Sequence, residues 1–113
     1  MKRNLEILID DILENIDNIE SFSKDLSIKE LSQNKLKLYA ITRALEIIGE
    51  ATKGISDDFR KKYPEIPWKN IAGLRDVITH AYFGVNSNRI WEIIKEDLPK
   101  LKQNMAKIKK NLK

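Results

Sequence analysis

An arginine and the only histidine of the chain stand five residues apart, at Arg75 and His80, with the polar residues Asp76 and Thr79 between them. A histidine titrates near neutral pH and can move protons, and the guanidinium of an arginine can bind two phosphate oxygens at once. Cleavage of RNA by transesterification needs such groups, because a 2′-hydroxyl loses a proton, a pentavalent phosphorus is stabilised and the leaving 5′-oxygen gains a proton. The spacing fits RNA cleavage without a metal ion, but on its own it is weak evidence, because an arginine in an ion pair and a solvated histidine often stand at this spacing on a polar helix face.

The apolar pattern around these residues predicts one helix from Pro67 to about Tyr82, since proline is tolerated in a first helical turn and Gly84 would end the helix. Asp76 lies one turn before His80, where its carboxylate can hold and polarise the imidazole. Successive helical residues turn by about 100°, so the apolar positions form a separate sector that we expect to face the core. This sector contains Ile71, Leu74, Val77, Ile78 and Ala81.

The same helical count places other residues near the arginine. Trp68 and Tyr82 have nearly the azimuth of Arg75, and the small residues Ala72 and Gly73 on this side would let another backbone approach closely. Trp68 would either stack on an RNA base or pack at a helix or subunit interface.

The preceding sequence predicts two amphipathic helices. The capping box formed by Ser27 and Glu30 predicts that the second helix starts near Ile28, and its apolar pattern continues to about Gly54. The first helix carries an apolar stripe with spacings of four and three residues and acidic residues on the opposite face. The stripe consists of Leu5, Ile9, Ile12, Ile16 and Ile19.

The predicted second helix also carries a polar row at spacings of three and four residues, formed by Arg43, Glu46 and Glu50. Side chains at these spacings are neighbours on a helix surface. One interpretation is a buried structural ion-pair row, and the other is a supporting role behind the active site.

The remaining sequence predicts a short helix and a long last one. Ser56 would cap a short helix that ends before Pro64. The last helix would begin after a cap at Asn86 or Ser87, and Pro99 must bend or restart it because proline removes a backbone hydrogen bond. Together these elements predict an all-α protein, a single domain over residues 1–113 that folds as an antiparallel bundle of four to five helices.

Composition excludes several kinds of site. The 113 residues contain no cysteine, which rules out disulfides, thiolate metal sites and cysteine nucleophiles. A single histidine cannot build a zinc site from several imidazoles within one chain, and we expect no metal or cofactor. No apolar run approaches the roughly 20 residues of a membrane-spanning helix, so we expect a cytoplasmic protein.

Charge is distributed unevenly along the chain. Between Glu6 and Asp25 there are seven acidic residues, whereas the segment after Asp97 contains six lysines and no acid. A basic tail can indicate binding to nucleic acid. Alternatively, the basic last helix packs beside the acidic first one.

The sequence around the arginine and the histidine resembles that of the HepT-like ribonucleases of the HEPN superfamily. The segment Arg75-Asp-Val-Ile-Thr-His80 matches the motif of HEPN ribonucleases, in which a polar residue follows the arginine and several further residues precede the histidine. The flanking stretches 66–75 and 80–85 resemble the surroundings of that motif, and stretches 43–51 and 91–99 resemble the second and last helices of the family. At position 76 an aspartate stands where asparagine is frequent in HEPN proteins. Its negative charge near a phosphate site bears on the rate of cleavage.

This resemblance implies a HEPN-like helical bundle that forms a symmetric homodimer. It also implies a metal-independent endoribonuclease toxin of a type VII HEPN/MNT toxin–antitoxin system, with Arg75 and His80 as catalytic residues. In such systems an MNT-type nucleotidyltransferase antitoxin transfers AMP to the tyrosine two residues after the motif histidine, which is Tyr82 here. The alternative role of Tyr82 is that of an aromatic residue that only packs at the end of a helix. The alternative function is a non-catalytic module that binds nucleotides or substrates for a nucleotidyltransferase.

Overall fold

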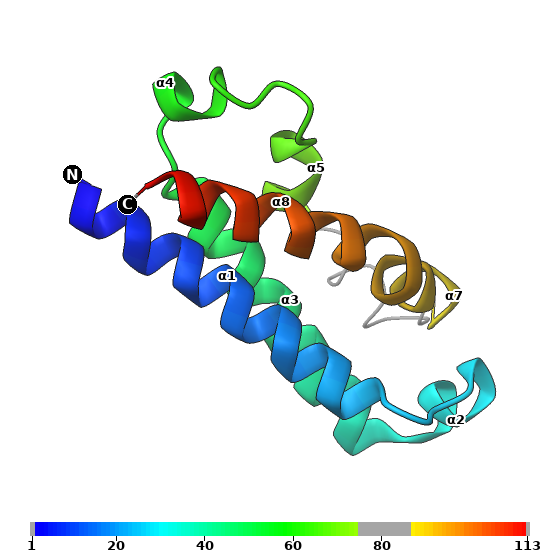
Figure 1. The fold of residues 1–113 in the computed structure, drawn as a ribbon. Helices are drawn as coiled ribbons and strands as arrows, with labels where there is room; N and C mark the ends of the chain where they lie inside the picture. Colours follow the sequence, from blue (N-terminus) through cyan, green and yellow to red (C-terminus); the bar gives the residue numbers. More distant parts are fainter. Residues whose placement is uncertain (1, 75–86, 113) are drawn as a thin grey trace.

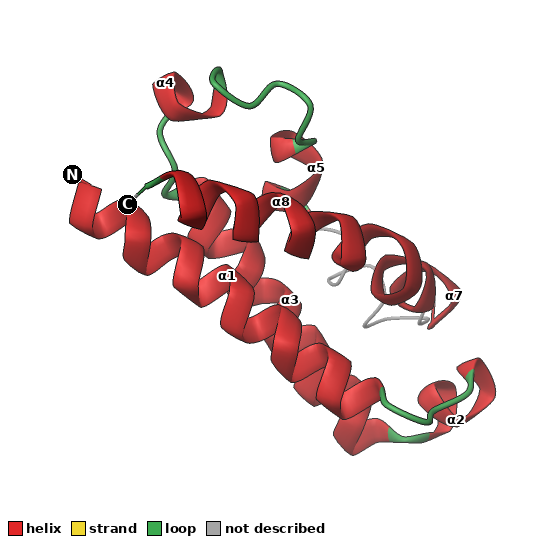
Figure 2. Ribbon diagram, viewed as in Figure 1, coloured by secondary structure: helices red, strands yellow, loops and turns green. Residues whose placement is uncertain are grey.

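The computed structural model describes the backbone of residues 2–74 and 87–112 and the side chains of residues 4–74 and 87–112. All regular elements in this part of the chain are helices, which confirms the all-α class (Figure 2). They are α1 (Lys2–Ser23), α2 (Ile28–Gln33), α3 (Lys35–Lys53), α4 (Asp57–Arg60), α5 (Trp68–Ala72), α7 (Ser87–Glu92), the π-helical turn η1 (Ile93–Asp97) and α8 (Leu98–Asn111).

The three long helices form the body of an antiparallel bundle. Helices α1 and α3 pack side by side in opposite directions, and α8 runs back along α1 so that the two chain ends lie near each other (Figure 1). Ion pairs confirm the direction of α8, because Lys102 contacts Asp17 whereas Lys109 contacts Asp10. The shorter helix α5 packs against α3 (Figure 1), and α4 lies beside the N-terminal part of α1, where Leu5 and Leu8 line a pocket together with Phe59.

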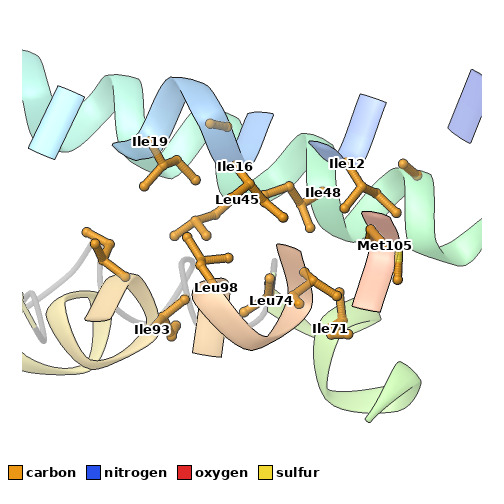
Figure 3. Packing of buried hydrophobic residues seen from close by; sticks show 14 of the residues in the cluster. Ile12, Ile16, Ile19, Leu45, Ile48, Ile71, Leu74, Ile93, Leu98 and Met105 are labelled. Carbon is orange, nitrogen blue, oxygen red and sulfur yellow. The ribbon is translucent and has the colours of Figure 1, made fainter. Parts of the chain in front are cut away.

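The core lies where these helices meet. The predicted stripe of α1 is buried, with Ile9, Ile12, Ile16 and Ile19 fully excluded from solvent, and only Leu5 is partly exposed. Figure 3 shows this stripe and residues of α3 facing side chains from α5, η1 and α8. Burying each such side chain contributes about 1.5–3 kcal/mol, so the bundle is held together mainly by apolar contact. None of the described helices combines the length and apolar character needed to cross a bilayer.

The capping box at the start of α2 is confirmed. The Ser27 hydroxyl accepts a hydrogen bond from the Glu30 backbone N–H at 3.1 Å, and the Glu30 carboxylate accepts one from the Ser27 N–H at 3.0 Å. The prediction of one continuous helix from this point to Gly54 is wrong, because the chain breaks at Asn34. Its side chain accepts a hydrogen bond from the Lys37 N–H at 3.0 Å and so caps α3. Asparagine competes in this way with the helical backbone.

The short helix α4 starts and ends as predicted. The Ser56 hydroxyl accepts a hydrogen bond from the Phe59 N–H at 3.2 Å, and the helix ends at Arg60, before Pro64. The Arg60 guanidinium then donates to the carbonyls of Thr52 (2.8 Å) and Ile55 (3.1 Å). Because carbonyls at a helix C-terminus have no partner within the helix, this arginine ties α4 to the end of α3.

The predicted restart at Pro99 is also confirmed. Helix α7 passes into the π-helical turn η1, in which the Leu98 N–H donates to the carbonyl of Ile93, and α8 begins with Pro99 in its first turn. Proline is accommodated there because a first-turn residue needs no N–H donor. Helix α7 begins at Ser87, and the alternative cap Asn86 lies outside the described residues.

Candidate active site

The five residues predicted to carry the chemistry lie outside the described part of the chain, as does the rest of segment 75–86. They are Arg75, Asp76, Thr79, His80 and Tyr82. The structure does define the elements on either side: α5 and Leu74 lead into this segment, and α7 follows it. These elements show how the bundle holds the two ends of the candidate site.

Helix α5 is fixed to the bundle by Trp68. Only 7% of this residue is exposed, and its indole N–H donates to the carbonyl oxygens of Tyr63 (3.0 Å) and Arg60 (3.2 Å). A buried ring whose N–H is already bonded has no face available for an RNA base. The packing interpretation of Trp68 is therefore confirmed, and the stacking interpretation is wrong.

The predicted uninterrupted helix from Pro67 to Tyr82 is wrong at Gly73. Helix α5 ends at Ala72, and Gly73 caps its C-terminus with a turn conformation (φ −86°, ψ 4°). Glycine is a poor helix former, which weakens the helix at this point. Pro67 is the N-cap of α5 and not part of its first turn. Residues before and after Gly73 therefore need not share one helical wheel, and the alignment of Trp68 with Arg75 no longer follows.

Two members of the predicted core sector are nevertheless buried. Ile71 is 7% exposed and Leu74 is 6% exposed, and both belong to the main apolar cluster. The other members, Val77, Ile78 and Ala81, lie outside the described residues. Because Leu74 is anchored in the core, the position at which the chain enters the segment with Arg75 and His80 is fixed.

A pocket of about 630 Å³ lies directly beside this entry point, between α5 on one side and η1 with α8 on the other. Gly73 and Leu74 line it, so it adjoins the residue that precedes Arg75. Apolar side chains from both walls, such as Ile71 and Leu98, also line it. Six charged residues line the pocket, three basic and three acidic: Lys69, Arg89, Lys100, Glu65, Glu92 and Asp97.

Two of these acids are already paired. Arg89 forms ion pairs with Glu92 and with Asp97, the second at 3.8 Å. The sequence did not predict this pocket. No sequence signal could have found it, because its walls come from segments about 30 residues apart that only the fold brings together.

The row of Arg43, Glu46 and Glu50 is not buried, so that prediction is wrong. The side chain of Arg43 is 63% exposed, and it pairs with Glu46 at 3.4 Å on the outer side of α3. Glu50 is also exposed. A surface pair of this kind contributes at most about 1 kcal/mol.

One of the two interpretations of the basic last helix, packing against the acidic first helix, can be checked directly, whereas binding to nucleic acid stays a prediction. Lys102 pairs with Glu20 (2.7 Å) and Asp17 (3.1 Å), and Lys109 pairs with Asp10 (2.8 Å), so packing against the acidic first helix is confirmed for these lysines. The hydrogen bond to Glu20, followed by that to Asp17, raises the pKa of Lys102 above its usual value. Other lysines of α8 lie on a different side of the helix.

Among residues 4–74 and 87–112, no group of three carboxylate or imidazole side chains could hold a metal ion. The single histidine lies outside these ranges.

Comparison with known proteins places the chain among ribonucleases. Residues 12–108 match the family model described as Ribonuclease HepT-like. A protein of Thermococcus cleftensis named "Probable ribonuclease HepT" is 44% identical over 110 residues, which cover 97% of this chain and 100% of that protein. A "Putative RNase" of Methanocaldococcus jannaschii is 45% identical over 104 residues, covering 92% of this chain and 95% of the relative. No solved structure matches the chain.

Proposed function

Because the chain belongs to the HepT-like ribonuclease family, we propose that it is a metal-independent endoribonuclease that cleaves RNA through Arg75 and His80. The observation that carries this proposal is the family match over residues 12–108, which includes both residues. Both relatives are named as ribonucleases, and the alignments cover 95% and 100% of their lengths, which supports the proposal.

The proposed reaction is a transesterification within the RNA backbone. The 2′-oxygen forms a bond to phosphorus and gives its proton to a base, while the bond from phosphorus to the 5′-oxygen breaks and that oxygen takes up a proton. His80 moves a proton, and Arg75 binds the phosphoryl oxygens on which negative charge develops. The products are a 2′,3′-cyclic phosphate and a free 5′-hydroxyl.

The reaction needs both a base and an acid, whereas one chain has one histidine. We therefore propose a symmetric homodimer in which the two copies of the motif segment face one cleft. The single chain exposes large apolar side chains that a second copy would cover: Ile7, Ile28, Leu36 and Tyr39. Light scattering should find a dimer at working concentration, and an active monomer would contradict this assembly.

We further propose that the protein is the toxin of a type VII HEPN/MNT system. In this proposal an MNT-type nucleotidyltransferase antitoxin transfers AMP from ATP to the hydroxyl of Tyr82. The phenolic oxygen forms a bond to the α-phosphorus, pyrophosphate leaves, and the phenolic proton is released. The added phosphodiester carries a negative charge two residues from His80, where it competes with RNA phosphate for Arg75.

The test of the ribonuclease proposal is the chemistry of the product ends. Purified protein is incubated with RNA in EDTA, and the new 3′ ends are examined for a cyclic phosphate. Cyclic ends formed without metal support the mechanism. Nucleotide binding without cleavage would favour the non-catalytic module. Cleavage that requires magnesium would contradict the proposed metal-independent mechanism.

A further inference from the structure

Helix α8 carries two rows of lysines on different sides. Lys102 and Lys109 are seven residues apart, and both pair with carboxylates of α1. Lys100 and Lys107 are also seven residues apart. An offset of two residues turns a helix by about 200°, so the second pair points away from the first. We refer to Lys102 and Lys109 as the inner row, and to Lys100 and Lys107 as the outer row.

The outer row is exposed and makes no ion pair with any residue in the described ranges. Lys100 lines the pocket between α5 and α8, together with Lys69 and Asn104. Asn104 lies on α8 between the two lysines of the row. The outer row therefore starts at the pocket and continues along α8 for about 10 Å.

The pocket itself is lined by equal numbers of basic and acidic residues, whereas the charge along α8 beyond the pocket is positive. From Leu98 to the end of the chain there is no acidic residue. Of the pocket's acids, Glu92 and Asp97 are paired with Arg89. Positive charge beyond the pocket is thus not cancelled by acids of α8 itself.

We propose that the outer row binds the sugar–phosphate backbone of the RNA substrate beside the catalytic segment. This inference rests on the proposed ribonuclease function. Leu74 lines the same pocket as Lys100 and immediately precedes Arg75, so RNA bound along the row passes the entry to that segment. Lysine is a flexible point charge that suits phosphates, and such contacts position RNA without reading its sequence.

An acidic protein surface is the other ligand that unpaired lysines attract. Protein interfaces usually have an apolar or aromatic centre. The exposed large apolar side chains of the described residues lie on α1, α2 and α3, and none of them lies on α8. RNA is therefore the ligand that this side of α8 fits.

The experiment compares the two rows in a His80→Ala background, which binds RNA without the proposed cleavage. One variant carries Lys100→Gln and Lys107→Gln, and its matched control carries Lys102→Gln and Lys109→Gln. Both lose two positive charges from the same helix. Affinity for a fluorescein-labelled single-stranded RNA of mixed sequence is measured by anisotropy from about 50 to about 200 mM salt.

The outer-row variant should bind about tenfold more weakly at the low-salt end, and the slope of log K against log salt should fall by about 1.4, or roughly 0.7 for each phosphate that a lysine no longer neutralises. The inner-row control should change by less than about twofold, because its lysines are occupied by α1. Equal reductions of affinity in both variants would show a net-charge effect and overturn the proposal. Unchanged RNA affinity, with or without weaker binding to the nucleotidyltransferase, would overturn it as well.

The same substitutions with His80 restored separate this inference from the ribonuclease proposal. Cleavage by the outer-row variant should show a raised KM and an unchanged kcat, because the row binds RNA away from the reacting bond. If the unsubstituted chain cleaves no RNA while binding still depends on the outer row, the ribonuclease proposal fails and the binding surface stands. If the chain cleaves RNA and the outer-row substitutions change neither binding nor KM, the ribonuclease proposal stands and the binding surface fails.

Discussion

The indole N–H of Trp68 donates a hydrogen bond to the backbone carbonyl of Tyr63 at 3.0 Å. This bond holds the first residue of α5 against the loop that precedes it, and α5 leads within a few residues to Arg75. The anchor therefore determines where the chain enters the proposed catalytic segment.

Replacing Trp68 by phenylalanine should lower the free energy of unfolding by about 1–3 kcal/mol, because the carbonyls of Tyr63 and Arg60 lose their donor. Denaturant unfolding measures this decrease. Trp91→Phe is the matched control, since Trp91 is only half-buried and its indole N–H bonds to no described residue. Equal decreases in the two variants would mean that ring size, and not the hydrogen bond, matters at Trp68.

The ion pairs of Lys102 with Glu20 and Asp17 should make stability depend on alkaline pH. The hydrogen bonds to Glu20 and then Asp17 raise the pKa of Lys102 above its ordinary value of 10.5, so the folded state favours the charged amine. The stabilisation is complete below the unfolded pKa and is lost as pH rises through the folded pKa. The difference in unfolding free energy between the wild type and Lys102→Gln should be constant up to about pH 10, shrink above it and fall with salt. A difference that grows with pH would contradict this origin.

Local signals in the sequence predicted local structure well. The Ser27–Glu30 capping box, the Ser56 cap and the restart at Pro99 each depend on backbone groups within a few residues, so the residue types alone determine them. The breaks at Asn34 and Gly73 were not predicted, because the apolar periodicity continues past both positions. A residue that can cap a helix can also sit within one, and only the packing of the segments on either side decides.

The charges of α8 show where sequence reasoning stops. Composition left two interpretations open, and the structure assigns the inner row to packing against α1 and leaves the outer row exposed. The two rows are offset by only two residues along α8, and which of them faces α1 depends on the packing of two helices that are about 90 residues apart in sequence. The pocket beside α5 depends in the same way on the tertiary arrangement.

Asp76→Asn should leave the fold intact and raise the cleavage rate severalfold, because it removes a negative charge close to the proposed phosphate site. Single-turnover cleavage with saturating enzyme measures the chemical step. A large decrease in rate would instead show that the carboxylate orients His80, and Asp76→Ala would then lose at least as much.

Tyr82→Phe should remain an active ribonuclease and escape inhibition by the nucleotidyltransferase and ATP, because it lacks the phenolic oxygen that accepts AMP. Intact mass and residual cleavage are measured on the same samples. Tyr63→Phe is the matched control, and it should be modified and silenced like the wild type. Modification at another residue, or equal silencing of Tyr82→Phe, would make Tyr82 a packing residue.

The most direct test of the account is the rate of RNA cleavage in EDTA by the wild type, Arg75→Ala and His80→Ala. Thermal melting of each sample verifies that the protein is folded, and anisotropy verifies that it still binds RNA. The account predicts cleavage by the wild type without metal and a decrease of about 100-fold or more in both variants, since proton transfer and phosphate stabilisation are each worth at least that much. Folded variants that cleave at the wild-type rate, or wild-type activity that vanishes in EDTA and returns with magnesium, would contradict it.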